Sequence, residues 1–341
     1  MVLGILTLGQ FIMVHKSILS HPFVLCLFLI LSCSCSFASP RSSANISPEI
    51  EETQPQSSPV TISPNRMEST PTAIPTQVLH TATPRAIATG NPELAPGGWK
   101  SLPVVPTMSP EAVDIFQNGL VLGNNPQAFS KVGDGEVATS WFLTMYDLDP
   151  SHFDLVPHGY LEPVIEYYAG SFEHVGVAAH AGFSTTLILD PLQAANDICE
   201  VEESPLECEL RRHRPSFTII SLGTNQVWTP DVFAVELRQM VEICIARGVV
   251  PILVTKGDNL EGDHSINAII ADVAREYEIP LWNFWLALQP LPNRGLQADG
   301  EHLTWAENDF DDPVVMAHAW PVRNLTALQV LHGLVTQLEL Y

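Results

Sequence analysis

Residues 216–225 read SFTIISLGTN, and this stretch decides the fold class. Its first seven residues are apolar or small, and several are β-branched or aromatic, which is typical of a short strand buried on both faces. The run stops at Gly223-Thr224-Asn225, which is a turn signal. A strand buried on both faces needs helices above and below it, so the flanking sequence has to supply them.

Candidate strands and helices alternate on both sides of this stretch. Before it, residues 128–132 and 174–180 (HVGVAAH) predict strands that end at Gly133-Asp134-Gly135 and Ala181-Gly182. After it, the pattern predicts strands over 249–255 (VVPILVT) and 280–285 (PLWNFW), and helices over 231–247, 264–277 and 323–340, the first capped by Asp231 and the last amphipathic. This alternation predicts an α/β fold, a three-layer α/β/α sandwich with a parallel sheet.

Residues 1–38 predict an export signal. They hold no acid and one base, Lys16, and their apolar run 23–32 (FVLCLFLILS) is too short to span a bilayer as a helix. Ser36-Phe37-Ala38 fits a small-x-small cleavage site, whereas Ile30-Leu31-Ser32-Cys33 resembles a bacterial lipobox that would place a lipid on Cys33. An uncleaved anchor helix is the third alternative. We therefore expect the protein outside the cytoplasm, secreted or at the cell surface, where the N-terminus is a candidate membrane tether.

Residues 39–97 have the composition of a linker. They contain 10 prolines and 16 serines and threonines, and no Phe, Trp or Tyr. Such a segment cannot bury enough apolar surface to offset the entropy lost on ordering, which predicts a disordered stalk. The folded domain is therefore expected over residues 98–341.

The charge balance excludes some classes of partner. The chain has 38 acidic and 15 basic residues, a net charge of -23. A nucleic-acid binder needs a basic face to displace counterions from phosphates, so nucleic acid is not an expected partner. A small molecule is the expected ligand, and the sequence does not indicate an oligomeric state.

Polar groups follow the predicted strands, where parallel sheets gather their active groups. In chain order they are Gly133-Asp134, Gly182, Gly223-Thr224-Asn225 and Asp299-Gly300-Glu301-His302. In this order they resemble the blocks of the SGNH (GDSL-type) hydrolase family: Gly-Asp-Ser, a loop glycine, Gly-x-Asn and Asp-x-x-His. The resemblance runs from Ala128 to the C-terminus and implies a flavodoxin-like sandwich.

The resemblance also implies a set of catalytic roles. His302 would be the base, and Asp299 would hold its imidazole in the right tautomer. The Gly182 N–H, the Asn225 side-chain amide and the backbone N–H at the nucleophile would form the oxyanion hole. Family members hydrolyse esters in this way with no cofactor or metal, so none is expected here.

The first block departs from the family, because position 135 is glycine where the nucleophilic serine belongs. Thr139 and Ser140 lie four and five residues further on and are not expected to reach the same point. Three explanations stay open. The domain is a pseudoenzyme that still binds a ligand; it activates water through His302 and Asp299 or recruits another nucleophile; or the sequence records a mutation or reading error.

The expected function is accordingly that of a hydrolase-like domain that acts on or binds esters, with impaired activity. Acyl or acetyl esters of carbohydrates are the favoured class, because the protein is expected at the cell surface and the family takes such substrates. The alternative is a non-catalytic, cell-surface ligand-binding module.

Three further features carry predictions. Cys199 and Cys208 flank a short acidic segment, which in an exported protein predicts a disulfide rather than a metal site. Residues 256–259 (KGDN) follow the strand over 249–255 and form either a substrate contact or a turn capped by Asn259. Trp228 and Trp305 follow the third and fourth blocks and belong either to the core or to a sugar or acyl pocket.

Overall fold

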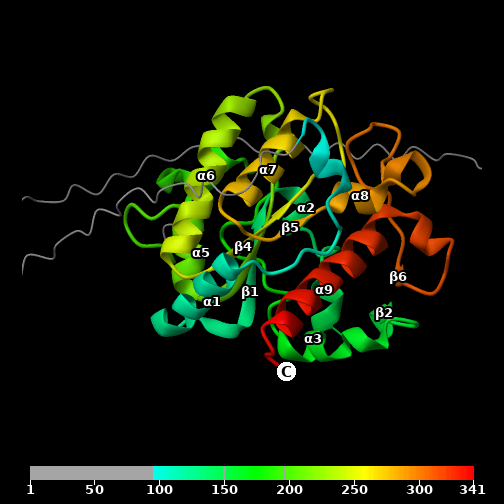
Figure 1. Cartoon of the computed structure of the whole chain (residues 1–341), viewed down its shortest axis with the longest axis horizontal. Coiled ribbons are helices and arrows are strands. Elements are labelled where there is room, and N and C mark those ends of the chain that lie inside the picture. The colour runs from blue at the N-terminus through cyan, green and yellow to red at the C-terminus, as the bar shows by residue number, and fades with distance from the viewer. Residues whose placement is uncertain (1–94, 149, 196) are drawn as a thin grey trace, which may run out of the picture. The chain divides into compact units, whose positions relative to one another are not determined.

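The computed structural model describes residues 95–148, 150–195 and 197–341 (Figure 1). The predicted export signal and nearly all of the predicted linker lie outside these residues. Within them, no helix is both long enough and apolar enough to cross a membrane.

The predicted parallel sheet is confirmed. It holds β1 (Asn125–Gly133), β3 (Pro215–Ser221), β4 (Val250–Val254) and β5 (Leu281–Trp282), in the spatial order β1-β3-β4-β5. All neighbouring pairs are parallel, and β3 and β4 are buried along their whole length, as their unbroken apolar runs predict. A separate parallel pair joins β2 (Phe153–Asp154) to β6 (Asn308–Asp309).

Helices cover both faces of the sheet, which gives the three predicted layers (Figure 1). On one side lie α1 (Pro110–Leu122), α5 (Pro205–His213) and α6 (Pro230–Ala246), and on the other α3 (Glu162–Tyr167), α8 (Phe284–Leu288) and α9 (Ala319–Gln337). The remaining helices are α2 (Gly135–Ala138), α4 (Thr185–Leu189) and α7 (Ser265–Glu276).

Local signals explain where the long helices begin. The Ser109 side chain caps α1, with Pro110 as its first residue. A capping box between Ser204 and Glu207 starts α5. The predicted cap of α6 was wrong, because Thr229 takes that position and Asp231 lies in the first turn.

The predicted strand over 174–180 is reduced to one bridge, Ala179 beside Gly133. The segment wraps instead around the buried carboxylate of Glu209, which accepts hydrogen bonds from His174 Nε2 (2.9 Å) and Val177 N (3.1 Å). A Cβ at Gly176 would collide with that same carboxylate. The Ala179 bridge still lies on the outer edge of β1, so the order matches the flavodoxin-like pattern 2-1-3-4-5.

The two C-terminal predictions need correction. The strand expected over 280–285 ends at Trp282, because Asn283 caps α8 by accepting from Leu286 N at 3.3 Å. The last helix begins at Ala319 rather than 323 and ends at Gln337. It is buried nearly all round instead of amphipathic, because α3 and β6 pack on it as well as α8.

The predicted disulfide between Cys199 and Cys208 is confirmed. Glu203 lies close to both sulfurs, but the disulfide leaves no thiolate there to bind a metal. Arg211 pairs with Glu203 at 2.6 Å, so the basic end of α5 is tied to the same acidic loop.

Candidate active site

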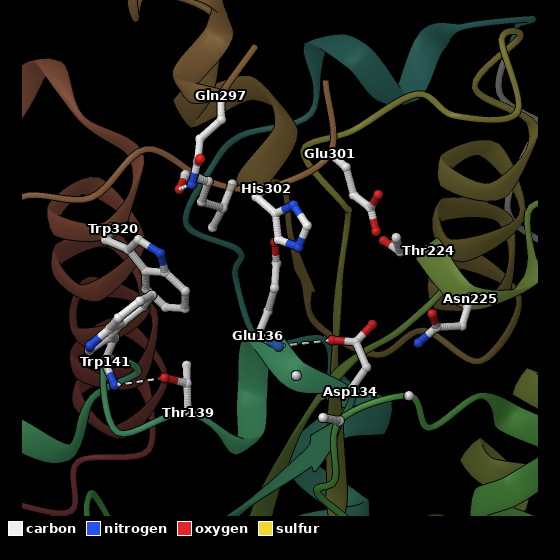
Figure 2. Close-up of a pocket in the computed structure, with 14 residues that line it drawn as sticks. Asp134, Glu136, Thr139, Trp141, Thr224, Asn225, Gln297, Glu301, His302 and Trp320 are labelled. Atoms are coloured by element: carbon white, nitrogen blue, oxygen red, sulfur yellow. Dashed lines mark hydrogen bonds between the residues drawn. The ribbon is translucent and has the colours of Figure 1, made fainter. Parts of the chain in front are cut away.

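The four sequence blocks meet at a pocket of about 370 Å³ at the carboxyl ends of β1 and β3 (Figure 2). Gly135, Gly182, Asn225 and His302 line it, and Asp299 stands behind His302. The site lies where the sheet order reverses, between β1 and β3, which is the usual position of ligand sites in open parallel sheets. The structure thus brings all five predicted residues together.

His302 and Asp299 form a local hydrogen-bonded pair. His302 Nδ1 donates to Asp299 Oδ2 at 2.8 Å, and the backbone N–H groups of Glu301 and His302 donate to Asp299 Oδ1 at 3.0 and 3.1 Å. The Glu301 N–H, then the His302 imidazole, lower the pKa of Asp299 to about 2. The bond to Asp299 in turn raises the pKa of His302. Since Nδ1 is occupied, Nε2 is the nitrogen available for proton transfer in the pocket.

Gly182 turns the chain beneath the pocket with φ +85°, a left-handed conformation that favours glycine. A Cβ built there meets no atom within 4 Å, so the backbone conformation rather than crowding calls for glycine. The predicted oxyanion role of its N–H stays a prediction.

Asn225 lies in a short 3-10 turn, Thr224–Gln226, after β3. Its Nδ2 donates to Phe183 O at 2.9 Å, which fixes the amide and leaves the second N–H of Nδ2 for a ligand. Gly223 is required here on two counts. Its φ is +128°, and a Cβ would lie 2.5 Å from Ile266 Cγ2.

The KGDN segment supports the Asn225 turn from behind. Asp258 Oδ2 accepts from Thr224 Oγ1 at 2.7 Å, and the buried Lys256 ammonium donates to Asp258 Oδ1 at 2.5 Å and to Glu261 Oε2 at 2.6 Å. Asn259 Oδ1 accepts from His264 N at 2.8 Å, as the turn interpretation predicts. None of residues 256–259 lines the pocket, so the structure shows support for the site rather than the alternative of a substrate contact.

Gly135 opens α2 directly above β1, and Asp134 caps this helix by accepting from Glu136 N at 3.1 Å. The φ of Gly135 is not positive, and a Cβ there would make ordinary contact with Ala181 Cβ at 3.7 Å. A Cβ at this position therefore fits the backbone without strain. Thr139 also lines the pocket, but Figure 2 shows it beside Trp141, on the side away from Asn225.

Sequence reasoning missed the acidic and basic groups at the floor of the pocket. Glu136 lines it, with Oε2 3.3 Å from Nη1 of the fully buried Arg323. Burial raises the pKa of Glu136 to about 7 against the opposing charge of Arg323. Burial likewise raises the pKa of Asp134 to about 6. The available signal was the acid directly after position 135, whereas Arg323 comes from α9, far along the chain.

Tryptophans form a wall between this pocket and a second one of about 320 Å³. Trp141 and Trp320 line both pockets, and Trp305 lines the second. The Trp141 ring lies 5.8 Å from that of Trp320 and 6.3 Å from that of Trp305. Trp305 therefore lines the second pocket, and a role in binding a sugar or acyl group stays a prediction. Trp228 is 85% exposed, so it does not belong to the core, and it lines neither of these two pockets.

No known family pattern matches the sequence. No curated protein matches it either. Among solved structures, similar chains include a GDSL-like lipase from Bacteroides thetaiotaomicron, with 14% identity over 64% of this chain and 96% of that chain and a TM-score of 0.38. TesA has 19% identity over 60% and 97% of the two chains and a TM-score of 0.38. The esterase EstA from Pseudoalteromonas sp. has 13% identity over 60% and 96%, and a TM-score of 0.37. The first belongs to the hydrolase type that the four blocks resemble.

Proposed function

We propose that residues 98–341 form an SGNH-type hydrolase-like domain whose pocket binds an ester. Hydrolysis through a covalent acyl-enzyme is impaired in it because position 135 has no nucleophile. The observation that carries the proposal is the meeting of all four blocks at one pocket, with the His302–Asp299 pair already formed at 2.8 Å.

The geometry supports binding of the ester carbonyl group in the pocket. The Gly182 N–H, the second N–H of Asn225 Nδ2 and the Gly135 N–H are the donors for the carbonyl oxygen of a bound ester. His302 Nε2 would take the proton of an attacking nucleophile and give it to the leaving group. The loss of a triad nucleophile costs about 10⁶-fold in kcat in one well-studied protease, which sets the scale of the impairment.

The proposed substrates are acyl or acetyl esters of carbohydrates, outside the cytoplasm. The export signal and stalk expected from the sequence support the location. The Trp141–Trp305 pair beside the pocket supports the substrate class, because exposed aromatic faces pack well against the apolar faces of sugar rings.

A non-catalytic binding module is the second candidate. Gly135 itself favours it, because the remaining blocks are intact around a position that lacks a reactive side chain. Such a module is stabilised by its ligand and turns nothing over.

Covalent labelling tests the proposal. We expect a serine-directed fluorophosphonate to add one phosphonyl group to the Gly135→Ser variant, at position 135, and none to the unchanged protein; intact-mass and peptide mass spectrometry measure this. The variant Gly135→Ser/His302→Ala is the control and is expected to label far more slowly. An adduct on the unchanged protein would show that a different side chain is the nucleophile, and an unlabelled Gly135→Ser variant would contradict the proposed site.

A further inference from the structure

Glu136 directly follows the position that lacks a nucleophile, and its carboxylate lies in the same pocket. In Figure 2 its side chain rises from α2 toward the imidazole of His302. The charges of these two groups influence each other, as they affect each other's pKa. The pocket is therefore lined by a carboxylate and an imidazole whose charges act on each other.

The carboxylate is held in place from below. Glu136 Oε2 pairs with Arg323 Nη1 at 3.3 Å, and Arg323 Nη2 donates to Ser221 Oγ at 3.0 Å. Aromatic rings pack around the guanidinium, with the centroids of Phe142 and Phe284 both 4.8 Å from Cζ. Glu136 Oε1 has no hydrogen bond to any residue that the structure describes, and 32% of the side chain is exposed. One oxygen is thus anchored by Arg323, and the other is left without a hydrogen bond to the described residues, in a side chain that lines the pocket.

We propose that Glu136 is the general base of a direct hydrolysis, in which a water molecule rather than a side chain attacks the bound ester and His302 is the general acid. This inference rests on the proposed ester pocket and adds to it an activity that needs no serine. It assigns the carboxylate a role that the resemblance to the SGNH family does not provide.

The steps balance as follows. The water oxygen bonds to the carbonyl carbon while one of its protons passes to the Glu136 carboxylate, and the carbonyl π pair moves onto the oxygen. Collapse of this tetrahedral intermediate re-forms the carbonyl and breaks the bond to the alcohol oxygen, which takes the proton from His302 Nε2. The proton on Glu136 then returns to His302 through solvent, and the products are the acid and the alcohol.

The surroundings suit both roles. Burial raises the pKa of Glu136 to about 7, Arg323 and His302 act to lower it, and Asp134 and Asp258 act to raise it further. A base with a pKa near the working pH is the most effective one. The bond to Asp299 raises the pKa of His302, which favours the protonated imidazole that an acid must be.

The alternative is that Glu136 has only a structural role, as the counter-ion of the buried Arg323. Two esters separate the roles, measured with the purified full-length chain. An aryl acetate such as 4-nitrophenyl acetate has a leaving group that needs no proton, whereas a simple alkyl acetate needs one. We expect Glu136→Gln to lower kcat/KM for both esters by about 10²–10⁴-fold, the usual contribution of a general base. We expect His302→Ala to lower it strongly for the alkyl ester and by less than about tenfold for the aryl ester.

Controls keep the test decisive if Glu136→Gln folds poorly. Glu162→Gln changes an exposed acid on α3 and is expected to keep the full rate. The His302→Ala variant leaves Glu136 and Arg323 unchanged. Its rates with the two esters therefore test whether His302 is the acid, in a protein that keeps the ion pair at the floor of the pocket. Melting temperatures of all variants accompany the rates, and the unchanged protein is expected to show no burst of 4-nitrophenol.

Three results would overturn the inference. They are a wild-type rate in folded Glu136→Gln, an equal loss for both esters in His302→Ala, or no turnover of the unchanged protein above buffer while Gly135→Ser is active. The last result removes the role of Glu136 and leaves the ester pocket standing. If Gly135→Ser is inactive and unlabelled as well, the proposed function itself fails.

Discussion

His302 is the residue for which the proposed role is most specific, because its hydrogen bond to Asp299 leaves Nε2 free for proton transfer. The pair was predictable because both members lie within one four-residue block, so no long-range folding is needed to bring them together. Glu136 was not predictable, because it is partly buried and its ion-pair partner Arg323 comes from the other end of the domain. A local motif thus identified the His302–Asp299 pair and missed the Glu136–Arg323 pair at the floor of the pocket.

Replacement of Asp299 by asparagine tests this pair. Because Asp299 raises the pKa of His302 above its ordinary 6.5, the wild-type pair stabilises the fold below that pH and loses this contribution as pH rises through the folded pKa. We expect Asp299→Asn to lower the pKa of His302. An NMR titration measures this pKa, and the His302→Ala variant assigns the signal. In the Gly135→Ser background kcat should fall on the order of 10⁴-fold, since an asparagine favours the wrong tautomer. An unchanged His302 titration would refute the coupling.

At the scale of elements, two loops that follow neighbouring strands hold each other. The turn after β3 carries Asn225, and the segment after β4 supplies Asp258. Asp258 Oδ2 accepts a hydrogen bond from Thr224 Oγ1 at 2.7 Å. Lys256 balances the charge of Asp258 in a buried position. The turn that carries Asn225, the proposed oxyanion donor, is therefore supported by Lys256 and Asp258, which do not line the pocket.

Thr224→Val removes the hydroxyl from this network without much change in volume. Asp258 is buried, so loss of the Thr224 hydrogen bond to its Oδ2 should cost about 1–3 kcal/mol in the free energy of unfolding, measured by urea titration. Thr224→Ser keeps the hydroxyl and is the matched control, with an expected cost well below that of Thr224→Val. Equal stabilities of the two variants would show that the bond to Asp258 does not support the turn.

The elements also show where sequence patterns succeed. The strands over 216–222 and 249–255 were predicted correctly because they are buried on both faces, and burial of this kind leaves an unbroken apolar run. The segment 174–180 has a similar run, yet it curves around Glu209 from α5. That carboxylate lies too far along the chain for any local pattern to reveal, so the segment was mispredicted as a full strand.

Over the whole molecule, the convergence of the blocks follows from topology. Parallel strands end at the same edge of their sheet, so polar groups after β1 and β3 meet wherever those strands are neighbours. The sequence was therefore enough to predict that the polar groups after β1 and β3 meet. It did not reveal the aromatic wall of Trp141 and Trp320, because α9 was expected to begin after Trp320 and to face solvent on one side.

The turnover of 4-nitrophenyl acetate by the unchanged chain, by Gly135→Ser and by Gly135→Ser/His302→Ala tests the central claim most directly. The claim is that the site is complete except for its nucleophile. It predicts a gain of at least about 10³-fold in kcat/KM for Gly135→Ser, because removal of a triad nucleophile costs a large factor in rate. It also predicts that the double variant loses most of that gain. A Gly135→Ser variant that folds, as its melting temperature reports, and is no faster than the unchanged chain would contradict it.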